Sequence, residues 1–94
     1  MIHVEDFIYA EIVDVLLDGG YPFFHSWESS DGRFTACINA DGEIEKSVGA
    51  TYMGHHEYLY TEVLTSYKIE DFKAVSGEET DFDLKKIEEE LNSR

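Results

Sequence analysis

Cationic side chains are scarce in this sequence, and none occurs in residues 1–32. The 94 residues contain 7 Lys and Arg against 21 Asp and Glu, so the formal net charge is −14 and the isoelectric point is near 4.3. A surface of this sign repels phosphate groups. The charge therefore argues against direct binding to nucleic acid or to an anionic membrane.

Cysteine and long apolar runs are also scarce. Cys37 has no second cysteine to pair with, which is typical of proteins from a reducing compartment. No apolar run approaches the roughly 18 residues that cross a membrane. Residues 1–6 carry none of the basic residues that open a secretion signal. These features predict a cytoplasmic protein that does not span membranes.

Catalytic and cofactor-binding motifs are missing as well. The glycines lie at predicted turns without the spacing of a phosphate-binding loop. His55 and His56 precede Glu57, but adjacent residues of a strand point to opposite faces, which does not suit a zinc site. Cys37 lies in a predicted strand of an electronegative protein, unlike reactive thiolates. We predict no enzymatic activity, no cofactor and no metal site. A small metal-assisted enzyme using the two histidines is kept as the second alternative.

The chain nevertheless has the composition of a folded domain. Hydrophobic residues make up 43% and aromatic residues 14%, with a single proline, whereas disordered acidic segments lack aromatic and β-branched residues. The length suits one domain over residues 1–94. Neither an internal repeat nor a linker interrupts it.

The first segment has the periodicity of an amphipathic helix. Apolar residues such as Ile8, Ile12 and Leu16 recur on one side when residues 4–18 are placed on a helical wheel. The pair Gly19-Gly20 follows directly and is typical of a helix end. We expect a helix over residues 4–18, and the β-branched residues of the segment leave a strand as the alternative.

Alternating apolar residues then predict antiparallel strands. Residues 23–28 and 33–38 flank Ser-Ser-Asp-Gly at 29–32, which is a strong hairpin signal. A second Asp-Gly, within residues 39–42, predicts another turn leading into a third strand at 43–48. This part of the chain is expected to form a three-stranded meander.

Residues 57–67 are rich in aromatic and β-branched residues, and their alternation favours a fourth strand. A helix over 53–64 is the alternative for this segment. Residues 69–75 either extend the fourth strand or form a fifth.

The last predicted element is a helix over residues 82–92. Thr80 and Asp83 have the spacing of a capping box at its start, with Asp in place of Glu. The expected fold is therefore α+β, with an N-terminal helix, a three- to five-stranded antiparallel sheet and a C-terminal helix.

Two rows of carboxylates stand out when the acidic residues are placed on these elements. A row on the first helix, the helix row, consists of Glu11, Asp14 and Asp18. A row on the predicted third strand, the strand row, consists of Asp41, Glu43 and Glu45. Alternate residues of a strand share one face at intervals of roughly 7 Å. Rigid rows of this kind are comparable to the regular negative charge of a nucleic acid.

Tyrosines concentrate near the second row and are candidate anchors for a partner. Tyr58 and Tyr60 lie two residues apart in the fourth predicted strand. Tyr and Trp are enriched where protein interfaces are buried most deeply. We therefore add these two tyrosines to the six carboxylates as predicted partner-binding residues.

The charge is larger than solubility requires, since a net charge of about 2–8 suffices for a small domain. Our first hypothesis is a binding protein that inhibits a basic, nucleic-acid-binding protein by mimicking DNA or RNA charge. A toxin-neutralising immunity protein or antitoxin is the first alternative. Size, charge and expected architecture resemble those of small phage-encoded DNA mimics, including anti-restriction and anti-CRISPR proteins, and of bacterial immunity proteins. The resemblance covers no specific residues.

Overall fold

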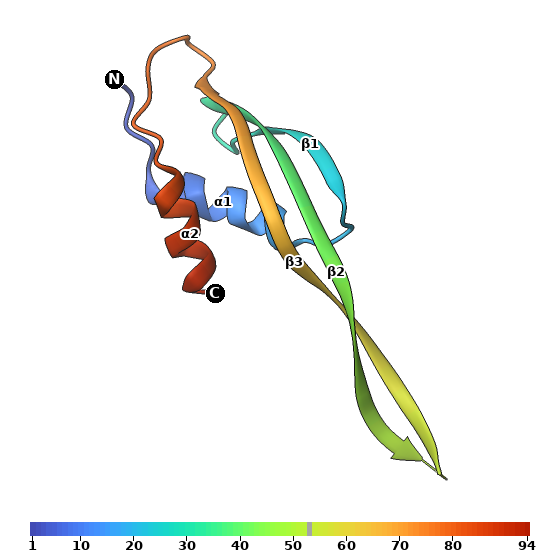
Figure 1. Cartoon of the computed structure of the whole chain (residues 1–94). Helices are drawn as coiled ribbons and strands as arrows, with labels where there is room; N and C mark the ends of the chain where they lie inside the picture. Colours follow the sequence, from blue (N-terminus) through green and yellow to red (C-terminus); the bar gives the residue numbers. More distant parts are fainter. Residues whose placement is uncertain (53) are drawn as a thin grey trace.

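The computed structural model describes residues 1–52 and 54–94, and the side chains of all of these except 50–52, 55 and 56. The elements in chain order are α1 (Asp6–Leu17), β1 (Phe23–Glu28), β2 (Phe34–Tyr52), β3 (His55–Ala74) and α2 (Leu84–Asn92) (Figure 1). The α+β class is confirmed, with an N-terminal helix, a three-stranded antiparallel sheet and a C-terminal helix. The side chains of His55 and His56, the alternative metal ligands, lie outside the described part.

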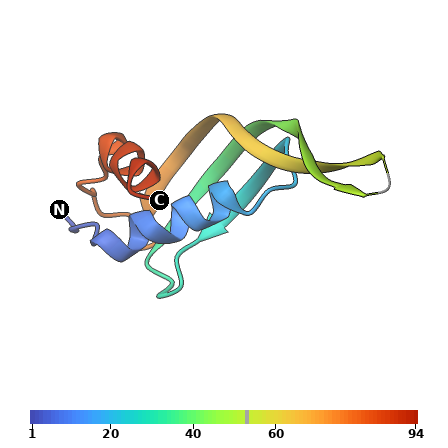
Figure 2. The same ribbon diagram turned by 90° about the horizontal axis from the view of Figure 1, so that it is seen from below.

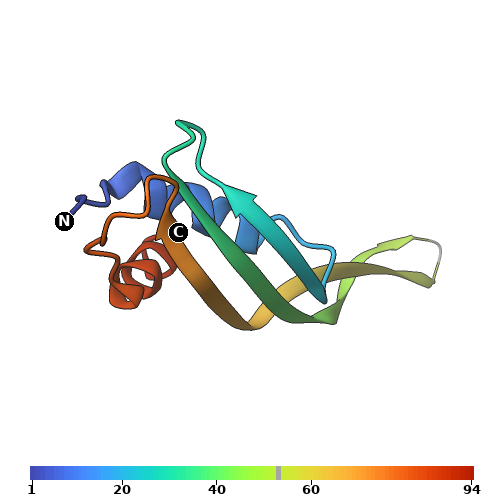
Figure 3. The same cartoon turned by 90° about the horizontal axis from the view of Figure 1, so that it is seen from above.

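The sheet has the order β1-β2-β3, and both helices lie on one of its faces (Figures 2 and 3). The core forms where α1 and α2 meet this face. Its buried residues are Val4, Ile8, Tyr9, Ile12, Val13, Leu16, Phe34, Ile38, Ala40, Ala74 and Ile87. In the part of the chain that the structure describes, no helix covers the other face of the sheet.

The first helix and the first hairpin confirm the sequence prediction. α1 buries Ile8, Ile12 and Leu16, and it ends where Gly19 and Gly20 take positive φ values of 87° and 76°. Glycine adopts this left-handed conformation without the steric cost that a Cβ imposes. The turn between β1 and β2 falls in the predicted Ser-Ser-Asp-Gly segment at 29–32.

The predicted second turn at residues 39–42 is wrong, because β2 runs through it without a break. The pairing of β2 with β3 changes register between Asp41 and Gly42, so this Asp-Gly marks an irregularity of the ladder. The ring of Tyr21 lies so close to Gly42 that a Cβ there would overlap it. This glycine therefore serves the close approach of an aromatic ring, which sequence alone does not distinguish from a turn.

Residues 57–67 form a strand, as predicted, and the helix considered for 53–64 is wrong for the residues described. The same strand continues through residue 74, so the segment after residue 69 is an extension and not a fifth strand. A register shift interrupts the ladder between Thr35 and Cys37, and Asp71 has a φ of 53° on the opposing strand. The strand bends at this irregularity without ending.

The C-terminal helix begins two residues later than predicted, and the Thr80 capping box is wrong. Asp83 is the N-cap residue, and its carboxylate accepts a hydrogen bond of 3.0 Å from the Lys85 backbone N–H. Thr80 instead forms a parallel β-bridge with Ile2. The N-terminal segment therefore holds the residues before α2 extended and delays the start of the helix.

The outer halves of β2 and β3 project from the rest of the molecule. We call residues 42–64 the arm and the remaining residues the body (Figure 1). β1 pairs only with residues 35–40 of β2, so the arm has two strands. The molecule measures 62 × 23 × 20 Å, and its radius of gyration is 17.2 Å, against about 12 Å for a compact chain of this length. The arm accounts for the elongated shape.

Candidate interaction surface

The helix row is mostly engaged in contacts within the body. Glu11 accepts hydrogen bonds from the backbone N–H (2.8 Å) and the hydroxyl (2.9 Å) of Ser30, which tie α1 to the β1–β2 turn. Asp14 lies 2.6 Å from a guanidinium nitrogen of Arg94. Asp18 is exposed at the C-cap of α1. Two of these three carboxylates therefore have internal partners and do not form an open row of charge.

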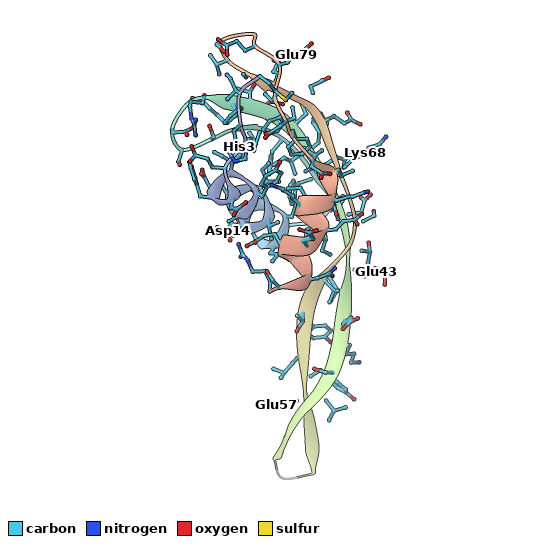
Figure 4. The ribbon with its side chains drawn as sticks, turned by 90° about the vertical axis from the view of Figure 1, so that its left-hand side faces the viewer. His3, Asp14, Glu43, Glu57, Lys68 and Glu79 are labelled. Atoms are coloured by element: carbon cyan, nitrogen blue, oxygen red, sulfur yellow. The ribbon has the colours of Figure 1, made fainter. Side chains whose placement is uncertain are left out.

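The strand row lies at the base of the arm and is open to solvent. Asp41, Glu43 and Glu45 are exposed at alternate positions of β2. Figure 4 shows the side chain of Glu43 pointing to the side of the sheet away from the helices. Asp41 accepts a long hydrogen bond of 3.4 Å from the Ser66 hydroxyl. Within the described residues, no ion pair involves any of the three carboxylates.

The arm has two faces, because directly opposed residues of antiparallel strands lie on the same side of a sheet. Tyr60 lies opposite Lys46. Glu45 precedes Lys46 along β2 and lies opposite Thr61, so it belongs to the other side. We call the first side the apolar face: Ile44, Lys46, Val48, Tyr58, Tyr60, Glu62 and Leu64. We call the second side the acidic face: Glu43, Glu45, Ser47, Leu59, Thr61 and Val63. The predicted tyrosines and the strand row are therefore on opposite faces.

The apolar face of the arm continues the face of β2 that forms the core in the body. Along β2, Phe34 and Ile38 are fully buried, whereas Ile44 and Val48, on the same side, are 68% and 64% exposed. Tyr60 is 66% exposed. The helices end before they reach these residues (Figure 2). Large apolar side chains thus extend from the core onto a surface that faces solvent.

Lys46 is the single cation of the arm sequence, and it does not neutralise the strand row. Its ammonium group lies 3.8 Å from the centre of the Tyr58 ring, in a cation–π contact. This places the positive charge on the apolar face, whereas Glu43 and Glu45 lie on the acidic face. The acidic face therefore keeps its negative charge.

Contacts at the root of the arm hold it against the end of α1, and sequence reasoning missed them. Glu62 accepts a hydrogen bond of 2.6 Å from the backbone N–H of Gly20. The Tyr21 hydroxyl donates to the carbonyl of Leu16, and its ring packs over Gly42. Burial, and secondarily the carboxylate of Glu62, raises the pKa of Tyr21. These contacts orient the arm relative to the body. The only signal for them in the sequence is the Gly-Gly-Tyr segment after α1.

The outer face of the sheet within the body is polar and carries both signs of charge. Lys68 lies 3.4 Å from Glu70, and it points away from the helices like Glu43 (Figure 4). An open depression of about 370 Å³ next to these residues is lined by Glu28, Cys37 and Lys73 among others. In the part of the chain that the structure describes, no three His, Cys, Asp or Glu side chains converge in a metal-binding arrangement.

The chain matches no protein-family model, and comparisons with curated proteins and with solved structures give no significant match. Neither of the two described helices is long and apolar enough to cross a membrane.

Proposed function

We propose that this protein binds a basic, nucleic-acid-binding protein and blocks its phosphate-binding surface. The strand row carries this proposal. Glu43 and Glu45 are exposed on a projecting arm, and within the described residues they have no cationic partner. The helix row does not share these properties, because Glu11 and Asp14 have partners in the body.

Electrostatics favour a basic partner over a neutral one. The net charge of −14 accelerates encounter with a basic surface, whereas contacts beyond about 8 Å are screened at physiological salt. Short-range complementarity therefore depends on carboxylates that a partner can reach. Those of the strand row meet this condition, and they compete for the Lys and Arg side chains that otherwise hold phosphates.

The two faces of the arm suit insertion into a groove. In such a complex the acidic face meets the cations of one wall, and the apolar face packs Tyr58 and Tyr60 against the other. Aromatic side chains in desolvated pockets contribute much of the binding energy of protein complexes. The separation of carboxylates and tyrosines is therefore compatible with one binding site that surrounds the arm.

The exposed apolar face also supports a second candidate, a neutraliser of a single toxin. Such an interface relies on Tyr58, Tyr60 and Ile44, and neutralising the strand row has little effect on it. The two candidates therefore differ in which face of the arm is sensitive to substitution.

The test is affinity capture from a cell lysate, followed by binding measurements on the purified partner. Inhibition of a nucleic-acid-binding protein requires that added DNA or RNA displaces the complex and that salt weakens it steeply. The double variant Glu43→Gln/Glu45→Gln is expected to lose about tenfold in affinity, equivalent to about 1.4 kcal/mol.

The matched control is Glu88→Gln/Glu89→Gln, which removes the same two charges from exposed positions of α2. It should change affinity by less than about twofold, through long-range attraction alone. Binding that is insensitive to both salt and competing nucleic acid would refute the proposal. Loss of binding in Tyr58→Ala and Tyr60→Ala with no effect of the glutamine substitutions would favour the toxin neutraliser.

A further inference from the structure

β3 is an edge strand of 20 residues, and among residues 1–52 and 54–94 only β2 pairs with it. An edge strand presents unpaired backbone N–H and C=O groups that another strand can use. The arm is the part of β3 that is most open to pairing with another strand, because a two-stranded ribbon with both faces in water is marginally stable by itself.

The two free edges of the arm differ in charge. Within the arm, the edge of β2 carries three charged residues among four consecutive positions, Glu43, Glu45 and Lys46. The edge of β3 carries two, Glu57 and Glu62. Only Glu62 lies within residues 58–64, and its carboxylate is held by the Gly20 backbone N–H. Charged side chains are a common protection of sheet edges, and the β3 segment also lacks proline and glycine. The β2 edge is therefore protected against strand addition, and the β3 edge is open to it.

We propose that the β3 edge pairs antiparallel with β3 of a second copy of this chain, with the two-fold axis at Thr61. In this register Leu59 lies opposite Val63 of the second copy, and Tyr58 lies opposite Leu64. Glu62 lies opposite Tyr60 of the second copy. A register centred on Glu62 would place two carboxylates in direct opposition, which is destabilising.

A second copy fits this edge despite the net charge of the chain. The arm carries −3 of the total of −14, and antiparallel pairing places the two bodies at opposite ends of the joined arms. Since each molecule is 62 Å long, the bodies lie well beyond the screening length of about 8 Å. The outer edges of the resulting four-stranded arm are the charged β2 edges, so association stops at the dimer.

The size of the contact sets the conditions for measuring it. The seven residues 58–64 that pair in this register extend about 23 Å, and an interface of one strand is smaller than the roughly 800 Å² per partner of standard stable complexes. The dimer therefore dissociates on dilution. The inference does not depend on the proposed function, although the same two-fold axis would bring both strand rows to one side of the dimer.

The experiment combines mass measurement with site-specific cross-linking. At about 1 mM the native chain is expected to approach twice its mass of 10.8 kDa in sedimentation equilibrium. Two cysteine variants, Thr61→Cys and Thr65→Cys, are made in a Cys37→Ser background and oxidised gently. Both threonines are exposed on β3, so the substitutions are matched.

Directly opposed residues have Cβ atoms about 4.5–5.5 Å apart, so Thr61→Cys is expected to form an intermolecular disulfide. In the same register the two residues at position 65 are separated by about 26 Å. The Thr61→Cys variant should therefore cross-link at least about tenfold faster. A native chain that stays monomeric at about 1 mM, or equal cross-linking of the two variants, would overturn the proposal. Equal melting temperatures of the variants establish that both are folded.

Discussion

The body and the arm are built from the same two strands, but only the body has a core. Ile38 and Ile44 lie on the same side of β2, six residues apart; the first is fully buried and the second is 68% exposed. The alternation of side chains along the strand is the same in both regions. What differs is the cover, because the helices pack against the body and reach the arm only at its root (Figure 2). Periodicity thus assigns a residue to a face, and only the neighbouring elements determine whether that face is buried.

The acidic residues of the body and of the arm also differ, in whether they have partners within the protein. Glu11 and Asp14 contact the β1–β2 turn and Arg94, so they contribute to the integrity of the body. Glu43 and Glu45 have no ion pair within the described residues. Both rows look alike in the sequence, but of the two only the strand row consists entirely of exposed carboxylates without an ion pair in the described residues.

The largest effect is expected from substitutions that compare the two isoleucines directly. Ile38→Ala removes fully buried methyl groups and leaves a cavity, which should lower the free energy of unfolding by about 2–5 kcal/mol. Ile44→Ala removes the same atoms from an exposed position and should change it by less than about 0.5 kcal/mol. Urea denaturation of both variants measures the difference. Similar losses would mean that the arm is covered in solution.

A smaller effect is expected at the junction between the regions. Gly42→Ala places a methyl group against the Tyr21 ring and should destabilise the protein by about 1–3 kcal/mol. In a Tyr21→Ala background the penalty should be smaller but not zero, because a Cβ at residue 42 would still lie 2.7 Å from the backbone carbonyl oxygen of Val63. The double-mutant cycle in urea gives the coupling. A Gly42→Ala penalty of unchanged size without the ring would show that the Val63 carbonyl, and not Tyr21, excludes the side chain.

The smallest effect is a dependence of stability on acid pH that originates in the body. The hydrogen bond from the Ser29 hydroxyl, followed by those from Arg33, lowers the pKa of Asp31 to about 2. The hydrogen bond from His3 lowers the pKa of Asp81. Since both folded pKa values lie below the value of 3.8 expected without these contacts, the stabilisation is complete above about pH 4. It is lost as the pH falls towards 2.

Melting temperatures between pH 5 and pH 2 measure this dependence. Asp31→Asn and Asp81→Asn should each make the decline with falling pH shallower. Glu43→Gln, on the arm, should leave the decline unchanged. A shallower decline in the arm variant would indicate that Glu43 has a stabilising contact in the folded protein.

Local sequence patterns predicted most of the fold correctly. The helical period before Gly19-Gly20 and the Ser-Ser-Asp-Gly turn identified α1 and the first hairpin, since both depend on residues close together in the chain. The second Asp-Gly was misread, because Gly42 makes room for the ring of Tyr21, twenty-one residues away, and for the carbonyl of Val63 on the neighbouring strand. The start of α2 was misplaced for the same reason, since Ile2 and Thr80 pair across the whole chain.

For the predicted interaction site, too, local spacing accounts for some features, and contacts between distant segments account for the others. Spacing along β2 placed Asp41, Glu43 and Glu45 on one side of the strand, and the structure has them exposed there. The pairing register between β2 and β3 cannot be deduced from either strand alone, and it places Tyr58 and Tyr60 on the opposite face of the arm. The partners of Glu11 and Asp14 come from distant segments, so no local pattern could mark that row as occupied.

The sequence by itself determined the charge, the order of the elements and the alternation of each strand, because these depend on composition and on neighbouring residues. Only the tertiary structure decided which carboxylates are free and that the hairpin extends past its cover as an arm. Those properties depend on which distant segments meet: the helices bury alternate residues from Phe34 to Ala40 of β2 and leave residues 43–48 in solvent.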